Sequence, residues 1–231
     1  MRTHVVASLA TLVIACSFPG AAEAQLDQLT QRDAAAGLRA ALEKGSQAAV
    51  AQLGHEDGFL ANPRVKIPLP ESLAKAEKAM RRVGLGDRAD ELVLAMNRAA
   101  ESAVLEAKPL FVAAAKKMTL QDAKGILTGG DTAGTEYFRR ATSEPLHAKF
   151  LPIVKRATAK LRLAQKYEAY AEKGARFGLV RQDQAKLEVY VTERALAGLF
   201  FMVGEEEKKI RKDPAGAASG IIGKVFGALR L

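Results

Sequence analysis

The sequence predicts an all-α protein, an irregular multi-helix bundle of about eight or nine helices with one Pro-rich extended segment. Three observations support this fold class. Apolar residues recur at helical spacing along nearly all of the chain after Gln25. No stretch shows the two-residue alternation of a half-buried strand. Aromatic residues make up only 6% of the chain and Trp is absent, so we expect aliphatic and small residues to fill the core.

The first half of the chain is expected to hold long helices on either side of one non-helical segment. Three prolines between residues 63 and 70 exclude a helix over residues 58–70, because proline lacks the backbone N–H and restricts the residue before it. Pro109 should start a new segment or kink the helix that contains it. The expected helices of this half cover residues 26–53, 71–83 and 87–118.

Start and stop signals divide the segment after residue 118. Thr119 and Asp122 form a capping-box pattern for a short helix that Gly129-Gly130 would close. Asp131-Thr132 is expected to cap the next helix, because such side chains accept hydrogen bonds from the free N–H groups of a first turn. Further interruptions of the segment are expected at Pro145 and Pro152.

The remaining helices are expected over residues 159–173, 182–212 and 217–229. The second contains an apolar stretch from Ala195 to Val203, which is too short to cross a bilayer and is typical of a core helix. Its acidic run Glu205-Glu206-Glu207 and the basic residues after it are expected to form a solvent-exposed face. The last helix carries an apolar stripe that would dock on the protein or, alternatively, on a membrane or partner.

The N-terminus has the order of features found in a secretory signal. Arg2 precedes an uncharged apolar run from Val5 to Phe18, and Ala22-Glu23-Ala24 supplies small residues where a signal peptidase cuts. We therefore expect residues 1–24 to be a signal peptide, residues 25–231 to be a single helical domain, and the mature protein to be periplasmic. The alternative is a lipobox, Val13 to Cys16, in which Cys16 would carry a lipid anchor.

The charge of the chain bears on its partners. The formal net charge is +9 at pH 7. Export would remove nucleic acid as a partner, and it leaves anionic lipid head groups or acidic envelope components as the surfaces that such a charge would meet. The alternative is that the charge is spread over a solvated surface.

Common catalytic and cofactor motifs are absent from the sequence. It contains no phosphate-binding loop with Lys-Ser/Thr, no Gly-x-Ser-x-Gly and no His-Glu-x-x-His. His55-Glu56-Asp57-Gly58 is typical of a polar turn and not of a ligand set, and the histidines show no spacing characteristic of a zinc site, so we expect no metal and no cofactor.

Asn97, Arg98 and Glu101 form the first candidate ligand site. Their spacing of three and four residues places them near one face of a helix, and the surrounding alanines suggest partial burial. A carboxylate beside an arginine in such a place could orient a ligand. The pattern favours the alternative, an ion pair that fixes the helix in the core.

The turn from Leu127 to Thr135, with Arg139 and Arg140 after it, forms the second candidate. Backbone N–H groups at a helix start and an arginine pair could hold an anion. Asp131 would repel that anion, so the pattern favours a structural turn.

Several blocks of the sequence resemble the bacterial domain-of-unknown-function family 4197. The similar blocks cover nearly the whole mature chain in the same order, and they are Asp57–Pro70, Met96–Glu101, Asp122–Arg140, Leu187–Phe200, Glu207–Pro214 and Val225–Gly227. The resemblance implies an exported, mostly helical bacterial protein, and it carries over no catalytic residues.

Three functions are compatible with these patterns. The leading hypothesis is a non-enzymatic envelope protein that binds an amphiphilic ligand or an envelope partner. The second is an envelope enzyme that uses Asn97, Arg98 and Glu101 with Tyr137 or Arg139. The third is a structural interaction module that uses the Pro-rich segment or the C-terminal tail as its contact surface.

Overall fold

The computed structural model describes residues 20–82, 84, 86–159, 164–165 and 186–213. Within these residues the secondary structure is entirely helical, which confirms the predicted fold class. The helices are α1 (Gly20–Leu53), α2 (Glu71–Arg82), α3 (Gly86–Val104), α4 (Ala107–Lys117), α5 (Leu120–Leu127), α6 (Ala133–Thr158) and α8 (Leu187–Lys212). The described residues do not support the finer expectation of eight or nine helices.

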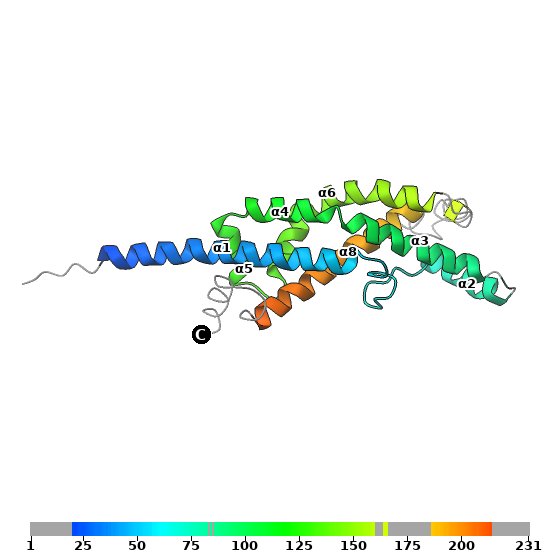
Figure 1. The fold of residues 1–231 in the computed structure, drawn as a ribbon, viewed down its shortest axis with the longest axis horizontal. Helices are drawn as coiled ribbons and strands as arrows, with labels where there is room; N and C mark the ends of the chain where they lie inside the picture. Colours follow the sequence, from blue (N-terminus) through cyan, green and yellow to red (C-terminus); the bar gives the residue numbers. More distant parts are fainter. Residues whose placement is uncertain (1–19, 83, 85, 160–163, 166–185, 214–231) are drawn as a thin grey trace, which may run out of the picture.

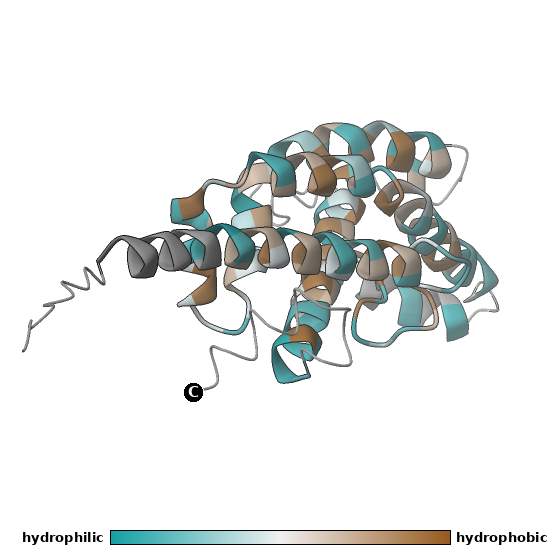
Figure 2. Ribbon diagram, turned by 60° about the vertical axis from the view of Figure 1, so that its left-hand side comes forward, coloured by the Kyte–Doolittle hydropathy of each residue, from teal (hydrophilic) through white to brown (hydrophobic). Residues whose placement is uncertain are grey.

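Helix α8 lies at the centre of the bundle. It crosses beneath α4 and α6 and contacts α6, α1 and α3 (Figure 1). Its apolar stretch from Ala195 to Val203 is mostly buried, as predicted. None of the helices in the described part is long and apolar enough to cross a membrane. Brown and teal residues alternate along each helix in Figure 2, as expected for amphipathic helices around a shared core.

Aromatic side chains fill the junction of α4, α6 and α8. The ring of Phe111 lies 4.9 Å from that of Phe138 and 6.1 Å from that of Phe200, and all three are buried. Such tilted and edge-on contacts add to the stabilisation from burial. Tyr137 donates its hydroxyl to the carbonyl of Ala114, at 2.9 Å, and burial raises the pKa of that hydroxyl.

Two expected helix boundaries follow local signals closely. α1 ends at Leu53 before Gly54, and Thr119 caps α5 through the predicted box with Asp122. The expected long helix over residues 87–118 is instead divided, because the chain turns at Leu105-Glu106 and Pro109 lies in the first turn of α4. Proline is tolerated there, since first-turn N–H groups have no partner within a helix.

The expected interruptions at Pro145 and Pro152 are wrong. Both prolines lie inside the continuous helix α6 and on its exposed side. A proline frees the carbonyl four residues before it, and here those carbonyls belong to the exposed residues Ala141 and Ala148. Water can therefore replace the lost hydrogen bonds, and the helix continues.

Three sequence-based predictions concern residues that lie wholly or largely outside the described part. Of the predicted signal peptide, only Gly20–Ala24 is described, as the start of α1, so Cys16 lies outside. The helix expected over residues 159–173 lies mostly outside, and the C-terminal helix over 217–229 lies entirely outside. They remain predictions.

Candidate functional site

The Pro-rich segment, residues 58–70, is held between α3 and α8. Its side chains Phe59, Val65 and Ile67 are buried in the core, and Phe59 lies so close to Gly198 of α8 that a Cβ there would approach its ring to 2.8 Å. Tyr190 of α8 donates its hydroxyl to the carbonyl of Pro68, at 3.0 Å. The apolar side of the segment thus faces the core.

Asn97 forms hydrogen bonds with both the N–H and the carbonyl of one residue of this segment, Ile67. Its Oδ1 accepts from the N–H of Ile67, and its Nδ2 donates to the carbonyl of Ile67, each at 2.9 Å. The same Nδ2 also donates to the carbonyl of Val93, at 2.7 Å. Because Asn97 is fully buried, these bonds satisfy groups that water cannot reach.

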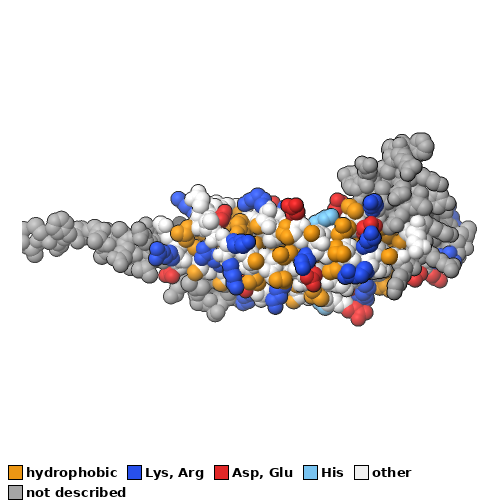
Figure 3. Space-filling model, turned by 90° about the horizontal axis from the view of Figure 1, so that it is seen from above, with side chains coloured by type: hydrophobic (Ala, Val, Ile, Leu, Met, Phe, Trp, Pro, Cys, Tyr) orange, Lys and Arg blue, Asp and Glu red, His pale blue; other side chains and the backbone are white. Residues whose placement is uncertain are grey.

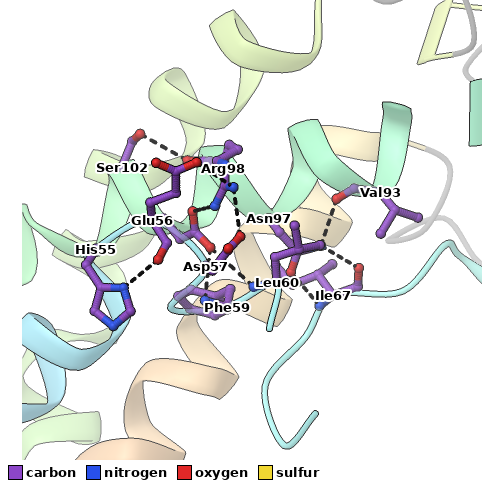
Figure 4. Close-up of polar contacts among 11 residues, drawn as sticks. His55, Glu56, Asp57, Phe59, Leu60, Ile67, Val93, Asn97, Arg98 and Ser102 are labelled. Atoms are coloured by element: carbon purple, nitrogen blue, oxygen red, sulfur yellow. Dashed lines mark hydrogen bonds and ion pairs between the residues drawn. The ribbon is translucent and has the colours of Figure 1, made fainter. Parts of the chain in front are cut away.

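Glu101 holds the turn that contains Phe59 and Leu60, the residues labelled at the start of the segment in Figure 4. Its Oε1 accepts from the N–H groups of Phe59 and Leu60, at 3.0 and 3.2 Å. Its Oε2 pairs with Nη1 of Arg98, at 2.7 Å, which confirms the predicted ion pair. The Glu101 side chain is only 5% exposed, so its charge is balanced by Arg98 and by backbone donors.

Arg98 extends this arrangement to the surface. Its Nη2 contacts Oε1 of Glu56 at 3.0 Å and Oδ1 of Asp57 at 2.7 Å. The hydrogen bond to Glu101, and then the one to Asp57, raise the pKa of the guanidinium. Asp57 has a φ of 67°, in the left-handed region that Asp tolerates better than most residues. We call Glu56, Asp57, Asn97, Arg98 and Glu101 the Glu101 cluster.

This geometry bears on the enzymatic hypothesis, which requires Glu101 to face a cleft. Both oxygens of Glu101 instead accept hydrogen bonds from the chain itself, and Asn97 is fully buried. The contacts observed in the Glu101 cluster thus position a loop on a helix. The predicted ligand-binding role of these residues has no support in their contacts.

The second candidate turn is organised by a residue that the sequence did not single out. Glu207 of α8 accepts from the N–H groups of Gly134 and Thr135 in the first turn of α6, at 2.9 and 2.7 Å, and from the Thr135 hydroxyl at 2.8 Å. Thr132 is the N-cap residue of α6 and makes no side-chain capping bond. The predicted capping by Asp131-Thr132 is therefore wrong, because a carboxylate from α8 takes that position.

Arg211 completes this second arrangement. Its Nη2 lies 2.8 Å from Oε1 of Glu207 and also donates to the carbonyl of Ile126 near the end of α5, at 2.9 Å. The expectation that Glu205-Glu206-Glu207 is a solvent-exposed face is thus wrong, because Glu207 is 4% exposed and Glu205 and Glu206 are half-buried. We call Gly134, Thr135, Glu207 and Arg211 the Glu207 cluster. In this cluster the carboxylate of Glu207 occupies the first turn of α6, where the sequence suggested that an external anion could bind.

Arg139 and Arg140 lie apart from both clusters, on the exposed side of α6. The guanidinium of Arg139 lies 4.7 Å from the ring centroid of Phe200 and 3.5 Å from a carboxylate oxygen of Glu136. In the described part of the chain, neither arginine bonds to a residue of the Glu101 cluster. The structure therefore does not join the predicted ligand residues into one site.

A groove lies between α1 and α5 and is large enough to hold a small ligand. It has a volume of about 420 Å³. Its apolar walls are Ala34, Ala35, Leu120, Ala123 and Leu127, and its polar rim is Gln31, Gln121, Lys124 and Thr128. Leu120 is 51% exposed, so part of the apolar wall is open to solvent. We call this cavity the α1/α5 groove.

Comparison with known proteins places the chain in a family. The model of the family described as "Protein of unknown function (DUF4197)" matches residues 28–227. The chain belongs to this family. No curated protein and no solved structure matches it. The match to DUF4197 includes every residue of the Glu101 cluster, the Glu207 cluster and the α1/α5 groove.

Proposed function

We propose that this DUF4197 protein is an exported, non-enzymatic binding protein of the bacterial envelope, and that its ligand is an anionic amphiphile held in the α1/α5 groove. The groove carries this proposal. Its volume falls within the range of about 300–1,000 Å³ that is usual for small-molecule sites.

The lining of the groove favours one orientation of a bound amphiphile, with its hydrocarbon chain along the apolar wall and its head group at the polar rim. Alanines on α1 and α5 and the exposed Leu120 offer an apolar wall for a hydrocarbon chain. Lys124 lies on the rim and forms no ion pair within the described residues, so it is available to an anionic head group. The side-chain amides of Gln31 and Gln121 nearby supply further donors.

The test of this site is binding of dodecanoate, measured by calorimetry below its micelle concentration. Ala34→Phe fills the groove and should weaken binding at least ~10-fold, since a blocked pocket loses the apolar contact that holds the chain. Ala36→Phe is the matched control, because Ala36 is exposed on α1 and does not line the groove. Equal affinities of the two variants would overturn the proposed site.

The head-group contact has its own pair of variants. Lys124→Gln should weaken dodecanoate binding roughly fivefold, because a charged hydrogen bond contributes about 1.5–3 kcal/mol at most and this one is exposed. Lys78→Gln on α2 changes the net charge equally, far from the groove in the sequence and on another helix. If both substitutions had the same effect, the lysine would act only through net charge.

Localisation is tested by the mass of the mature protein in its native envelope. A mass that begins at Gln25 supports the proposed signal peptide, and an acylated chain that begins at Cys16 supports the lipid-anchored alternative. Lipid analysis of the same sample should find an anionic amphiphile. A full-length chain in the cytoplasm would contradict export.

A further inference from the structure

We infer that the outer face of α4 and α6 is a docking surface for an anionic bilayer. The two helices lie side by side along the top of the molecule in Figure 1, and they contact each other. Their exposed basic residues are Lys108, Lys116, Lys117, Arg139, Arg140, Lys149, Lys155 and Arg156. We call this surface the basic face. The inference does not depend on the proposed ligand of the α1/α5 groove.

The charge of the basic face is largely uncompensated. Glu136 and Glu144 are the only acidic residues within these two helices, so eight cationic side chains stand against two anionic ones. Seven of the eight form no ion pair with another described residue, and the exception is Arg139, which pairs with Glu136. A cluster of this size attracts an anionic surface over roughly a Debye length, about 10 Å at 0.1 M salt.

Basic residues on α8 provide a contrast within the same molecule. Lys208 pairs with Glu205 at 3.1 Å, and Lys209 pairs with Glu206 at 2.6 Å. Their charges are therefore neutralised locally and add little to the field at a distance. The lysines of α4 and α6 have no such partners among the described residues and stay free to meet phosphate groups.

The shape and apolar content of the basic face suit a bilayer. Helix α6 has 26 residues, so it is roughly 39 Å long and presents an extended line to a planar surface. Small apolar residues lie exposed between its charges, namely Ala141, Pro145, Ala148 and Pro152. Figure 3 shows this face, with blue side chains scattered among orange ones and with fewer red ones. Such residues tolerate contact with the head-group region.

A bilayer fits this face better than a nucleic acid does. Single-stranded nucleic acids are bound by stacking on exposed aromatic rings. The aromatic residues of α4 and α6 do not provide these rings, because Phe111, Phe138 and Phe150 are buried and Tyr137 is half-buried with its hydroxyl bonded to Ala114. Duplex DNA can bind a positively charged surface without stacking on aromatic rings. The experiment therefore also measures binding to a short DNA duplex.

The experiment is flotation of the chain from residue 25 to 231 with lipid vesicles at about 0.1 M NaCl. We expect binding to vesicles with roughly 30% phosphatidylglycerol in phosphatidylcholine, and none to phosphatidylcholine alone. Raising the salt to about 0.5 M should weaken the binding at least tenfold, because the Debye length falls. Equal binding to both kinds of vesicle would overturn the inference.

A matched pair of charge reversals locates the surface. Lys149→Glu with Lys155→Glu and Arg156→Glu should lower the vesicle partition coefficient more than about 10-fold, since each basic residue near such a surface contributes about 1 kcal/mol. Lys78→Glu with Arg82→Glu and Arg88→Glu changes the net charge equally on α2 and α3, and it should retain most of the binding. Thermal unfolding by circular dichroism checks that both variants fold.

Two results would contradict the basic face as a bilayer surface. One is an equal loss of binding in both triple variants, which would mean that net charge alone drives the association. The other is binding of a short DNA duplex at lower protein concentration than the anionic vesicles, with the same dependence on Lys149, Lys155 and Arg156. That outcome would assign the face to a nucleic acid.

Discussion

Glu101 on α3 and Glu207 on α8 occupy similar environments but hold different kinds of backbone. Each is a buried carboxylate that accepts hydrogen bonds from two backbone N–H groups of a distant segment. Each also pairs with one arginine on its own helix. Glu101 binds an irregular turn, whereas Glu207 binds the first turn of α6. The positive end of that helix adds to the attraction for Glu207.

The two arginines differ more than the two glutamates. Arg98 is 33% exposed and shares its charge with Glu56 and Asp57. Arg211 is 14% exposed, and besides Glu207 it bonds to the backbone carbonyl of Ile126. Loss of Glu207 would therefore leave a nearly buried cation without its carboxylate, whereas Arg98 would keep two surface partners. Removing a buried charge partner should cost more in the Glu207 cluster.

The largest expected effect is that of Glu207→Ala. It removes the nearly buried carboxylate that pairs with Arg211 and leaves the N–H groups of Gly134 and Thr135 without their acceptor, so the free energy of unfolding should fall by about 3–5 kcal/mol. Urea unfolding followed by circular dichroism measures this. Glu136→Ala removes a carboxylate that is 50% exposed and pairs with Arg139 at the surface, and it should cost under about 1 kcal/mol. Equal losses would mean that the Glu207 cluster contributes no more than a surface pair.

Glu101→Gln should cost less, about 1–3 kcal/mol, because the amide oxygen still accepts from Phe59 and Leu60 while Arg98 turns to its surface partners. Hydrogen exchange should show faster exchange at the amides of Phe59 and Leu60 than in the wild type. Glu207→Gln, measured the same way at Gly134 and Thr135, sharpens the comparison. A larger loss for Glu101→Gln than for Glu207→Gln would reverse the proposed order.

Two glycines test how tightly each cluster is enclosed. A Cβ on Gly58 would meet the backbone oxygens of Leu53 and Gln52 at 2.5 and 2.6 Å, whereas a Cβ on Gly134 would meet the flexible end of Leu42 at 2.4 Å. Both alanine variants should destabilise by about 1–3 kcal/mol, with Gly58→Ala the worse because backbone yields less than a side chain.

Gly125 supplies the control for these substitutions, because a Cβ there meets nothing within 4 Å inside α5. Gly125→Ala should stabilise the protein by about 0.5–1 kcal/mol, since alanine favours the helix. Thermal or urea unfolding of the three variants measures these changes in the free energy of unfolding. Stabilisation by Gly58→Ala would show that the turn beside Glu101 is loosely packed.

The smallest expected effect concerns acid and the exposed carboxylates outside both clusters. The pKa of Asp122 lies below its ordinary value because of its hydrogen bonds with the Thr119 hydroxyl and then the Thr119 backbone. A lowered folded-state pKa adds stability above the unfolded value of about 4, and that stability is lost as the pH falls through the folded value. Asp122→Asn should therefore flatten the decline in stability below about pH 4 slightly.

Local signals predicted the parts of this fold that depend on neighbouring residues. The capping box of Thr119 and Asp122 spans three residues, so the sequence contains all of its partners. The Arg98–Glu101 pair was predictable for the same reason. The predicted helix interruptions at Pro145 and Pro152 were wrong because the sequence does not show that the freed carbonyls face solvent.

Long-range partners could not be found in this way. Glu207 lies 73 residues from Gly134 in the sequence, and nothing in its acidic run distinguishes it from Glu205 or Glu206. The backbone partners of Glu101 were equally hidden, although the Pro-rich segment signalled N–H groups that need acceptors outside a helix. The α1/α5 groove arises from the pairing of two helices, and no motif marks its walls.

The position of α8 has a consequence for the order in which the protein can fold. It is the last described helix in the chain, yet it contributes Glu207 and Arg211 of the Glu207 cluster, the Tyr190 bond to Pro68 across 122 residues and the buried ring of Phe200. A chain that emerges N-terminus first therefore lacks its central helix until about four-fifths of it has appeared. If the protein is exported as proposed, the late appearance of α8 keeps the chain unfolded while it crosses the membrane. Folding of the bundle then follows translocation.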